Sequence, residues 1–187
     1  MGSVSRAAEL VRNFKSISAD QVNVQKKEFY LFDYIKDSLN TMQGALDDEK
    51  IIVNLTGDNP LLFNDPGIFY QILNNLIDNT VKHAYKNEGG ILDIDIKDYA
   101  REIRINFTDY GAGISKDDLS KIFDPFFTTA GGMGGVGLGL NIIYRLVNNS
   151  LKGSITCDTK LGKGSIFKII IPKSNDIKSG EMANINS

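Results

Sequence analysis

The sequence predicts an α+β fold, a two-layer α/β sandwich in which helices gather on one face of a mixed sheet. Apolar residues recur at helical spacing over about 32–46 and 66–85, which predicts two long amphipathic helices. Strict alternation over 91–97 and 102–108 predicts two half-buried strands that form a hairpin. Further strands are predicted before and after these segments. A single sheet with the helices packed on one face explains this order of helices and strands along the chain.

The composition is that of a globular domain and excludes several classes of partner. The chain has 187 residues, of which 42% are hydrophobic and 24% charged, enough for one well-buried domain plus appendages. With a net charge of -2 and no dense basic run, we expect no nucleic-acid partner. No apolar run approaches the ~20 residues that span a bilayer, so a cytoplasmic location is expected. Residues 1–3 resemble a cloning remnant, and the full-length protein could carry a membrane anchor upstream.

The first helix is predicted over residues 4–20. Its apolar positions Ala7, Leu10, Phe14 and Ile17 repeat at 3-4-3 spacing, which favours a partner helix. A polar linker leads to a short strand at 28–31 and then to the helix 32–46. Two further strands are expected at 51–55 and 61–63, separated by turn-forming residues.

The helix over 66–85 is expected to carry a ligand-binding face. Asp65 is placed to cap it and Pro66 takes the favoured first position. At 100° per residue, four polar side chains fall on one stripe while the opposite side is apolar: Asn75, Asn79, Lys82 and His83. We therefore expect the apolar side of the helix to pack against the core and the polar stripe to bind a polar ligand.

The second half of the chain combines a glycine-rich loop with a closing hairpin. A short helix near 115–122 has Ser115 as its expected cap. Residues 131–139 contain six glycines, which predicts a mobile lid before a helix at about 137–149. Strands at 153–159 and 165–171 form the final hairpin, and the polar tail 174–187 is expected to be disordered.

Four segments, taken in order and spacing, resemble the N, G1, F and G2 boxes of the ATP-binding domain of sensor histidine kinases. This domain belongs to a superfamily that includes gyrase, mismatch-repair ATPases and heat-shock chaperones. The segments are Asn75–His83, Asp109–Gly113, Ile122–Thr129 and Gly135–Leu140, and the resemblance runs from about residue 28 to 172. It implies the Bergerat ATP-binding fold, with ATP and Mg²⁺ as ligands.

The resemblance also assigns roles to single residues. It implies Asn79 as the Mg²⁺ ligand, and a neutral amide oxygen suits a cation whose charge the triphosphate balances. It implies Asp109 as the acceptor for the adenine amino group. Lys82 can reach the phosphates as a point charge, and His83 is read as a contact beside the nucleotide. The other expected nucleotide-binding residues are Asn75, Gly111, Gly113, Ile114, Phe127, Thr128, Thr129, Gly135, Gly137, Leu138 and Gly139.

Simpler interpretations of these residues remain open. Lys82 could form an ordinary surface salt bridge, and the adjacent Phe126 and Phe127 could be core anchors instead of a hinge or latch for the lid. Glycines before the helix at 137–149 would let backbone N–H groups meet phosphate oxygens, since a Cβ would hold the anion away. Ala130 and Val136 replace a basic residue and a threonine that are common in the family, which would weaken nucleotide binding.

The residue at position 75 bears on where the γ-phosphoryl group goes. In the gyrase and chaperone branch a glutamate stands four residues before the Mg²⁺ ligand and deprotonates water. Asn75 cannot take a proton, so the sequence favours a kinase over a hydrolase. A histidine kinase needs a phosphoacceptor histidine on a helical hairpin, and His83 is the chain's one histidine. No catalytic residue is therefore expected within this chain.

These observations predict a domain organisation and a set of partners. Residues 4–24 resemble the later helix and linker of the dimerisation and phosphoacceptor hairpin, and residues 25–173 the ATP-binding catalytic domain. The expected partners are ATP, a hairpin of the same or a partner subunit, and a response regulator through the full-length protein. A homodimer through residues 4–20 is a further expectation. The alternatives are a degenerate interaction module and a serine kinase of the anti-sigma-factor type.

Overall fold

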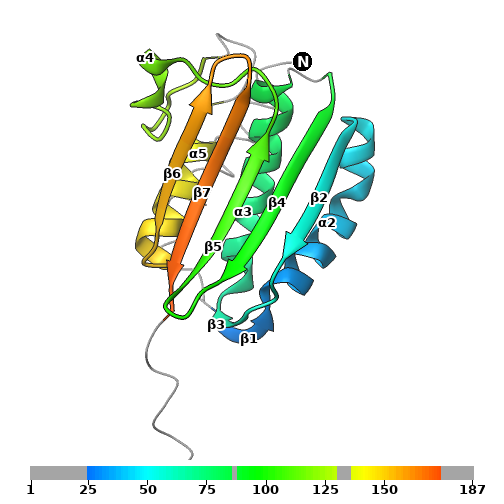
Figure 1. Cartoon of the computed structure of the whole chain (residues 1–187), viewed down its shortest axis with the longest axis vertical. Helices are drawn as coiled ribbons and strands as arrows, with labels where there is room; N and C mark the ends of the chain where they lie inside the picture. Colours follow the sequence, from blue (N-terminus) through cyan, green and yellow to red (C-terminus); the bar gives the residue numbers. More distant parts are fainter. Residues whose placement is uncertain (1–24, 86–87, 130–135, 174–187) are drawn as a thin grey trace, which may run out of the picture.

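A five-stranded sheet forms one layer of the molecule, and helices α2, α3 and α5 cover one of its faces (Figure 1). The computed structural model describes residues 25–85, 88–129 and 136–173. The other face of the sheet carries no helix in this part of the chain. The predicted two-layer α+β architecture, with a mixed sheet and helices on one side, is thereby confirmed.

The elements follow one another much as the sequence predicts. In chain order they are β1 (Lys27–Tyr30), α2 (Leu31–Asp48), β2 (Ile51–Gly57), β3 (Leu61–Asn64), α3 (Pro66–Asn79), the π-helical turn η1 (Thr80–Ala84), β4 (Gly90–Asp98), β5 (Glu102–Asp109), α4 (Lys116–Leu119), α5 (Gly139–Arg145), the π-helical turn η2 (Leu146–Ser150), β6 (Ser154–Lys160) and β7 (Gly164–Pro172). The helix expected over 4–20, the glycine-rich segment 130–135 and the tail 174–187 lie outside the described residues.

The main sheet has the strand order β2-β4-β5-β7-β6. β2 pairs in parallel with β4, and the other three pairs are antiparallel, which makes the sheet mixed. β1 and β3 form a separate two-stranded sheet at the end of the molecule where α3 begins (Figure 1). The sequence predicts both strands but not that β3 leaves the main sheet.

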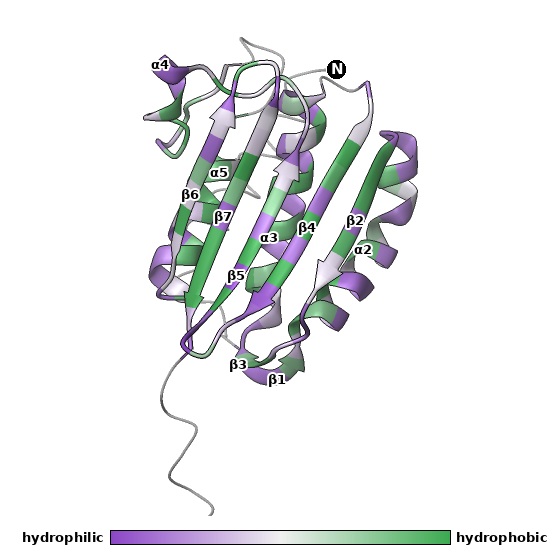
Figure 2. Ribbon diagram, in the orientation of Figure 1, coloured by the Kyte–Doolittle hydropathy of each residue, from purple (hydrophilic) through white to green (hydrophobic). Residues whose placement is uncertain are grey.

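The core lies between the sheet and the three helices. Alternate residues of the central strands point into it, so hydrophobic and hydrophilic positions alternate along the ribbons in Figure 2. The deepest positions include Ile94, Ile103 and Ile169 on the strands and Leu73 on α3, each at most 1% exposed. Full burial of such a side chain contributes about 1.5–3 kcal/mol, so the packing of the helices on the sheet contributes much of the stability of the fold.

Local capping fixes where the helices begin. The Asp65 side chain accepts a hydrogen bond from the backbone N–H of Gly67 at 2.9 Å, so α3 starts at Pro66 as predicted. Ser115 caps α4 by accepting from the N–H of Asp118 at 3.2 Å. Within the described ranges, no helix combines the length and apolar character needed to cross a membrane.

Two of the predicted helices end in a π-helical turn instead of continuing as α-helix. The N–H of Tyr85 donates to the carbonyl of Thr80 at 3.1 Å, and the N–H of Leu151 to that of Leu146 at 3.0 Å. An i→i−5 bond admits one extra residue into the turn and rotates the residues that follow. The expected extent of both helices is correct, but hydrophobic periodicity does not reveal this change of pitch.

Candidate functional site

A cavity of about 670 Å³ lies beside the last turns of α3, the end of β5 and the start of α5. This volume is within the usual range for sites that bind small molecules. Thirteen of the residues predicted to contact a nucleotide line it: Asn75, Asn79, Lys82, His83, Asp109, Gly113, Ile114, Phe127, Thr128, Thr129, Gly137, Leu138 and Gly139. Residues from four separate segments of the chain are thus brought around one space.

Two of the predicted contacts are not among the residues that line the cavity. Gly111 turns its Cα toward the backbone of Ala84, and a Cβ on Gly111 would lie 2.2 Å from the Ala84 carbonyl oxygen. Gly111 therefore serves the packing of its loop on η1, and its N–H donates to Asp109 at 3.0 Å. Gly135 lies outside the described residues.

The polar stripe of α3 and η1 faces the cavity. The side-chain N–H₂ of Asn75 donates to the carbonyl of Gln71 at 2.8 Å, which fixes the orientation of this amide. Asn79 is half-buried on the cavity wall, and none of the described residues hydrogen-bonds its side-chain amide. The amide oxygen of Asn79 is therefore available to a ligand as a neutral donor atom.

Lys82 forms an ion pair within the stripe. Its Nζ lies 2.8 Å from Oδ1 of Asp78, one helical turn earlier, and both side chains are partly exposed. The salt bridge that the sequence left open for this lysine is therefore present. Exposed pairs of this spacing contribute only about 0.3–0.5 kcal/mol, so the ammonium group can exchange Asp78 for a more highly charged phosphate.

His83 is held in its neutral form by its surroundings. Burial lowers the pKa of the imidazole, the nearby Asp78 raises it, and Lys82 lowers it again. The net result is a pKa below the ordinary value, so the ring is uncharged at neutral pH. A neutral imidazole can pack against a base or exchange a hydrogen bond, but it does not carry positive charge to the phosphates.

Asp109 is a buried carboxylate at the end of β5, with 6% of its surface exposed. Burial raises its pKa, while hydrogen bonds from the N–H of Gly111 and from the backbone and side chain of Ser165 act in the opposite direction. These donors hold the carboxylate in one orientation. Asp109 is thus a fixed hydrogen-bond acceptor, as a site for an exocyclic amino group requires.

Ser165 is a site residue that the sequence interpretation missed. It is 4% exposed, lines the cavity and donates to Asp109. Its hydroxyl also lies 3.0 Å from that of Thr159 on the neighbouring strand. The available signal was the turn Gly162-Lys163-Gly164, which marks Ser165 as the start of the last strand. The β5–β7 register, which the sequence does not reveal, places Ser165 opposite Asp109.

Three more polar residues of α3 also line the cavity and were not predicted: Gln71, Asn74 and Asp78. They precede Asn75, Asn79 and Lys82 by one turn or less, so helical spacing could have found them. Asp78 in particular changes the electrostatics of the site, since it holds Lys82 and acts on His83.

The glycines act mainly by letting protein segments approach one another. A Cβ on Gly113 would lie 2.3 Å from the Lys160 carbonyl oxygen, and one on Gly137 would lie 2.6 Å from the Phe127 oxygen. Both residues have a positive φ, +66° and +71°. A Cβ at either position would therefore collide with the protein backbone. That a Cβ at Gly137 would also hold an anion away stays a prediction.

The start of α5 forms another part of the cavity wall. The helix begins at Gly139, and Leu138 before it has no side chain that caps the first turn. A Cβ on Gly139 would lie 3.4 Å from Oδ1 of Asn75, so α5 approaches the stripe of α3 closely at this point. The backbone of α5 and the amides of α3 therefore face the same space.

Phe126 and Phe127 behave differently from one another. Phe127 lines the cavity and packs against the core. Phe126 is 66% exposed and has a φ of +67°, an unusual conformation for a bulky residue. Its carbonyl carbon lies against Gly137, so this strained turn supports the segment that leads into α5.

The described residues suit a magnesium nucleotide better than a bare metal ion. In the described ranges, no group of three or more His, Cys, Asp or Glu side chains converges on a point. Mg²⁺ keeps several waters and commonly binds one or two protein oxygens plus phosphate. Asn79 and the phosphates of a nucleotide would together supply such a set.

The chain matches a family model described as histidine kinase-, DNA gyrase B-, and HSP90-like ATPase over residues 64–175. It is similar to the sensor protein RprX of Bacteroides fragilis, with 28% identity over 170 residues that cover 88% of this chain and 33% of RprX. It is also similar to the adaptive-response sensory kinase SasA of Synechococcus elongatus, with 33% identity over 127 residues, or 66% of this chain and 32% of SasA.

A solved structure supports the same assignment. The catalytic domain of histidine kinase ThkA superimposes with a TM-score of 0.68 at 28% identity, covering 80% of this chain and 98% of that domain. The chain spans about a third of the length of RprX and of SasA. Because the family model covers more than half of the chain and includes the cavity described above, the chain belongs to the histidine kinase-, DNA gyrase B-, and HSP90-like ATPase family.

Proposed function

We propose that this chain is the ATP-binding catalytic domain of a two-component sensor histidine kinase. Residues 25–173 would form that domain, and residues 4–24 would be the end of the helical hairpin that carries the phosphoacceptor. The observation that carries the proposal is that one cavity is lined by the Asn79 amide, the Lys82 ammonium group and the buried Asp109 carboxylate.

The three side chains suit three parts of ATP. Asp109, fixed by Gly111 and Ser165, would accept from the adenine amino group and would repel the carbonyl oxygen that guanine has in its place. Lys82 would move from Asp78 to the phosphates. Asn79 would bind Mg²⁺, which when present neutralises part of the phosphate charge.

The absence of a carboxylate at position 75 supports transfer to a protein and not to water. Asn75 lines the cavity, and its amide is tied to the Gln71 carbonyl, so it offers no proton acceptor. In the proposed reaction a histidine nitrogen on the hairpin attacks the γ-phosphorus. The bond from this phosphorus to the β–γ bridging oxygen breaks, and ADP leaves. The chain contributes position and charge to this step.

The partners of the reaction would come from the full-length protein. The phosphoacceptor hairpin would belong to the same or a partner subunit, and the phosphoryl group would pass to a response regulator. ThkA, whose catalytic domain shares this fold, has been solved in complex with the response regulator protein TrrA. A cytoplasmic location would suit both ATP and the Cys157 thiol, whose pKa burial raises to about 12.

A second candidate is a degenerate module that keeps the fold as an interaction domain. Val136 lines the cavity where a threonine is common in the family, so one hydroxyl donor to phosphate is missing. Such a loss weakens binding by about 1–3 kcal/mol when the partner is charged. This candidate predicts a folded chain that does not bind ATP.

Calorimetric titration of ATP·Mg²⁺ into the wild-type chain and into Asn79→Ala tests the proposal. We expect magnesium-dependent binding by the wild type and a loss of the magnesium dependence in the variant. A wild-type chain that takes up no ATP would reject the proposal and favour the degenerate module. Adding an intact hairpin and testing for acid-labile phosphate then separates transfer to histidine from transfer to serine.

A further inference from the structure

We propose that Tyr85 is a positioning residue for nucleotide binding: its hydroxyl ends the β4–β5 ladder and thereby holds the adenine-binding segment Asp109–Gly113 in place. Tyr85 directly follows η1 and does not line the cavity. The inference rests on the proposed function, because it concerns how the Asp109 carboxylate is presented to a base.

The Tyr85 hydroxyl bridges two strands through two hydrogen bonds. It donates to the backbone carbonyl of Ile91, the second residue of β4, at 2.6 Å. It accepts from the backbone N–H of Tyr110, the first residue after β5, at 2.9 Å. One hydroxyl thus satisfies a backbone acceptor of β4 and a backbone donor next to Asp109.

These two backbone groups are neighbours in the sheet. The last pair of the β4–β5 ladder is Leu92 with Asp109, so an unbroken ladder would next place Ile91 opposite Tyr110. The Tyr85 hydroxyl stands between these two residues and replaces a direct contact between their backbones. The strands therefore separate immediately after Asp109, which frees the following residues to turn toward η1.

The ring of Tyr85 is held by the start of β4. A Cβ on Gly90 would lie 2.3 Å from the Cζ atom of Tyr85, so only a glycine admits the ring at this position. Gly90 does not have a positive φ, which means that alanine is compatible with its backbone but not with the ring. The position of the Tyr85 ring therefore depends on a glycine at residue 90.

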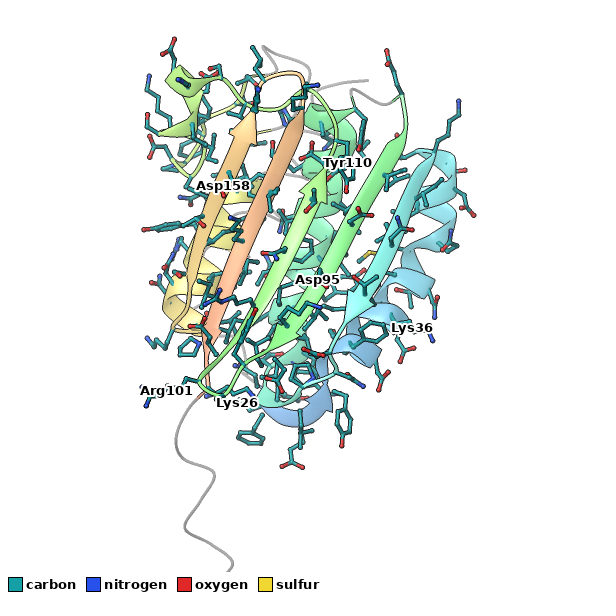
Figure 3. The ribbon with its side chains drawn as sticks, in the orientation of Figure 1. Lys26, Lys36, Asp95, Arg101, Tyr110 and Asp158 are labelled. Atoms are coloured by element: carbon teal, nitrogen blue, oxygen red, sulfur yellow. The ribbon has the colours of Figure 1, made fainter. Side chains whose placement is uncertain are left out.

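Ala84, which lines the cavity, also contacts the adenine-binding segment Asp109–Gly113. The carbonyl of Ala84 accepts from the N–H of Ala112 at 2.9 Å and lies against Gly111. Beyond this, the Tyr110 hydroxyl donates to Asp93 of β4 at 2.5 Å (Figure 3 shows Tyr110 at the end of the sheet where β5 finishes). Hydrogen bonds to Ala84, to Tyr85 and to Asp93 therefore hold the segment that follows Asp109.

This arrangement joins the two halves of the candidate site. Asn79, Lys82 and His83 come just before Tyr85 along α3 and η1, and Asp109 comes just before Tyr110. The π-helical bond from the Tyr85 N–H to Thr80 rotates the end of the helix, and the hydroxyl then reaches the sheet. Tyr85 therefore sets the position of the adenine acceptor relative to the phosphate-binding stripe.

The test compares Tyr85→Phe with Tyr70→Phe in the full chain. Tyr70 is 43% exposed on α3, and its hydroxyl has no hydrogen-bond partner among the described residues. For Tyr85→Phe we expect ATP·Mg²⁺ to bind about three- to tenfold more weakly, the effect of one net hydrogen bond. GTP binding should change less, so the preference for ATP over GTP should fall. Tyr70→Phe should leave both affinities unchanged.

Gly90→Ala provides a second test that keeps the hydroxyl but displaces the ring, and it should weaken ATP binding in the same sense. Thermal melting accompanies each titration. If Tyr85→Phe lowers the melting temperature while ATP affinity and the ATP/GTP ratio stay at the wild-type values, Tyr85 is merely structural and the inference is overturned. A wild-type chain that binds no ATP would instead reject the proposed function itself.

Discussion

Burial favours the uncharged form of two titratable side chains that line the cavity, Asp109 and His83. It raises the pKa of Asp109 and lowers the pKa of His83, because a charged group loses water when it is buried. Hydrogen bonds from Gly111 and Ser165 limit the effect on Asp109. Positive charge on the cavity wall therefore comes from Lys82, which Asp78 balances.

The lowered pKa of His83 predicts a loss of stability in mild acid. The free imidazole has a pKa of about 6.5, and the folded chain binds this proton less tightly than the unfolded chain does. The His83 contribution is therefore complete above that pH and is lost as the pH falls below it toward the lower folded pKa.

Thermal melting of the nucleotide-free chain between pH 8 and pH 5.5, with His83→Gln as the comparison, checks this. The fall in melting temperature on acidification should be larger for the wild type than for the variant. Both chains retain Asp109, whose raised pKa changes stability with pH in the opposite direction. Subtracting one melting-temperature profile from the other therefore cancels its contribution. Parallel pH profiles for the two chains would contradict the assignment.

At the scale of the elements, unusual backbone conformations occur at the end of α3 and just before α5. α3 ends in the π-helical turn η1, from which Lys82, His83 and Ala84 reach the cavity or the adenine-binding segment. Phe126, in the segment after α4, and Gly137, just before α5, both have a positive φ. Such conformations persist only where surrounding contacts determine them.

Replacing Gly137 by alanine tests the turn before α5. The new Cβ would lie 2.6 Å from the Phe126 carbonyl carbon, and the φ of +71° disfavours any side chain. We expect the free energy of unfolding to fall by about 1–3 kcal/mol, as measured by urea denaturation.

Gly44→Ala is the matched control for this substitution. Gly44 lies within α2, and a Cβ there would have no atom within 4 Å. Alanine is favoured over glycine in a helix by about 0.5–1 kcal/mol, so this variant should be stabilised. Equal effects from the two substitutions would show that the turn does not require glycine.

At the scale of the whole molecule, the open face of the sheet is built to meet water. Polar side chains pair across its strands, as in the hydrogen bonds from Asn54 to Asp93 and from Thr56 to Asp95, and in the ion pair of Lys168 with Asp158 (Figure 3 labels Asp95 and Asp158 on this face). Self-association is instead expected through the apolar stripe predicted over residues 4–20.

Light scattering of the intact chain tests that expectation. We predict a dimer at high concentration, because an apolar stripe without its partner helix favours association. Replacing Leu10 and Phe14 by lysine should shift the chain to a monomer without lowering the melting temperature of the sheet-containing part. A wild-type chain that stays monomeric throughout would remove the dimer from the proposal.

The sequence by itself determined the architecture and most of the cavity wall. Strand alternation, helical spacing and caps such as Asp65 are local properties, so they identify the elements before any packing is known. The polar stripe from Asn75 to His83 is recognised in the same way, because amide and basic side chains are unusual on an otherwise apolar helix. The role of Asp109 as an acceptor comes instead from the resemblance of Asp109–Gly113 to a family motif.

Only the tertiary structure decided which residues hold the site in place. The contact of Ser165 with Asp109 and the Tyr85 bridge from Ile91 to Tyr110 depend on geometry that no periodicity records. The purpose of Gly111 and Gly137 was also decided there, because their neighbours are backbone atoms from other segments. Local sequence sets which groups are available, whereas strand register and one added residue in a helical turn set which of them meet.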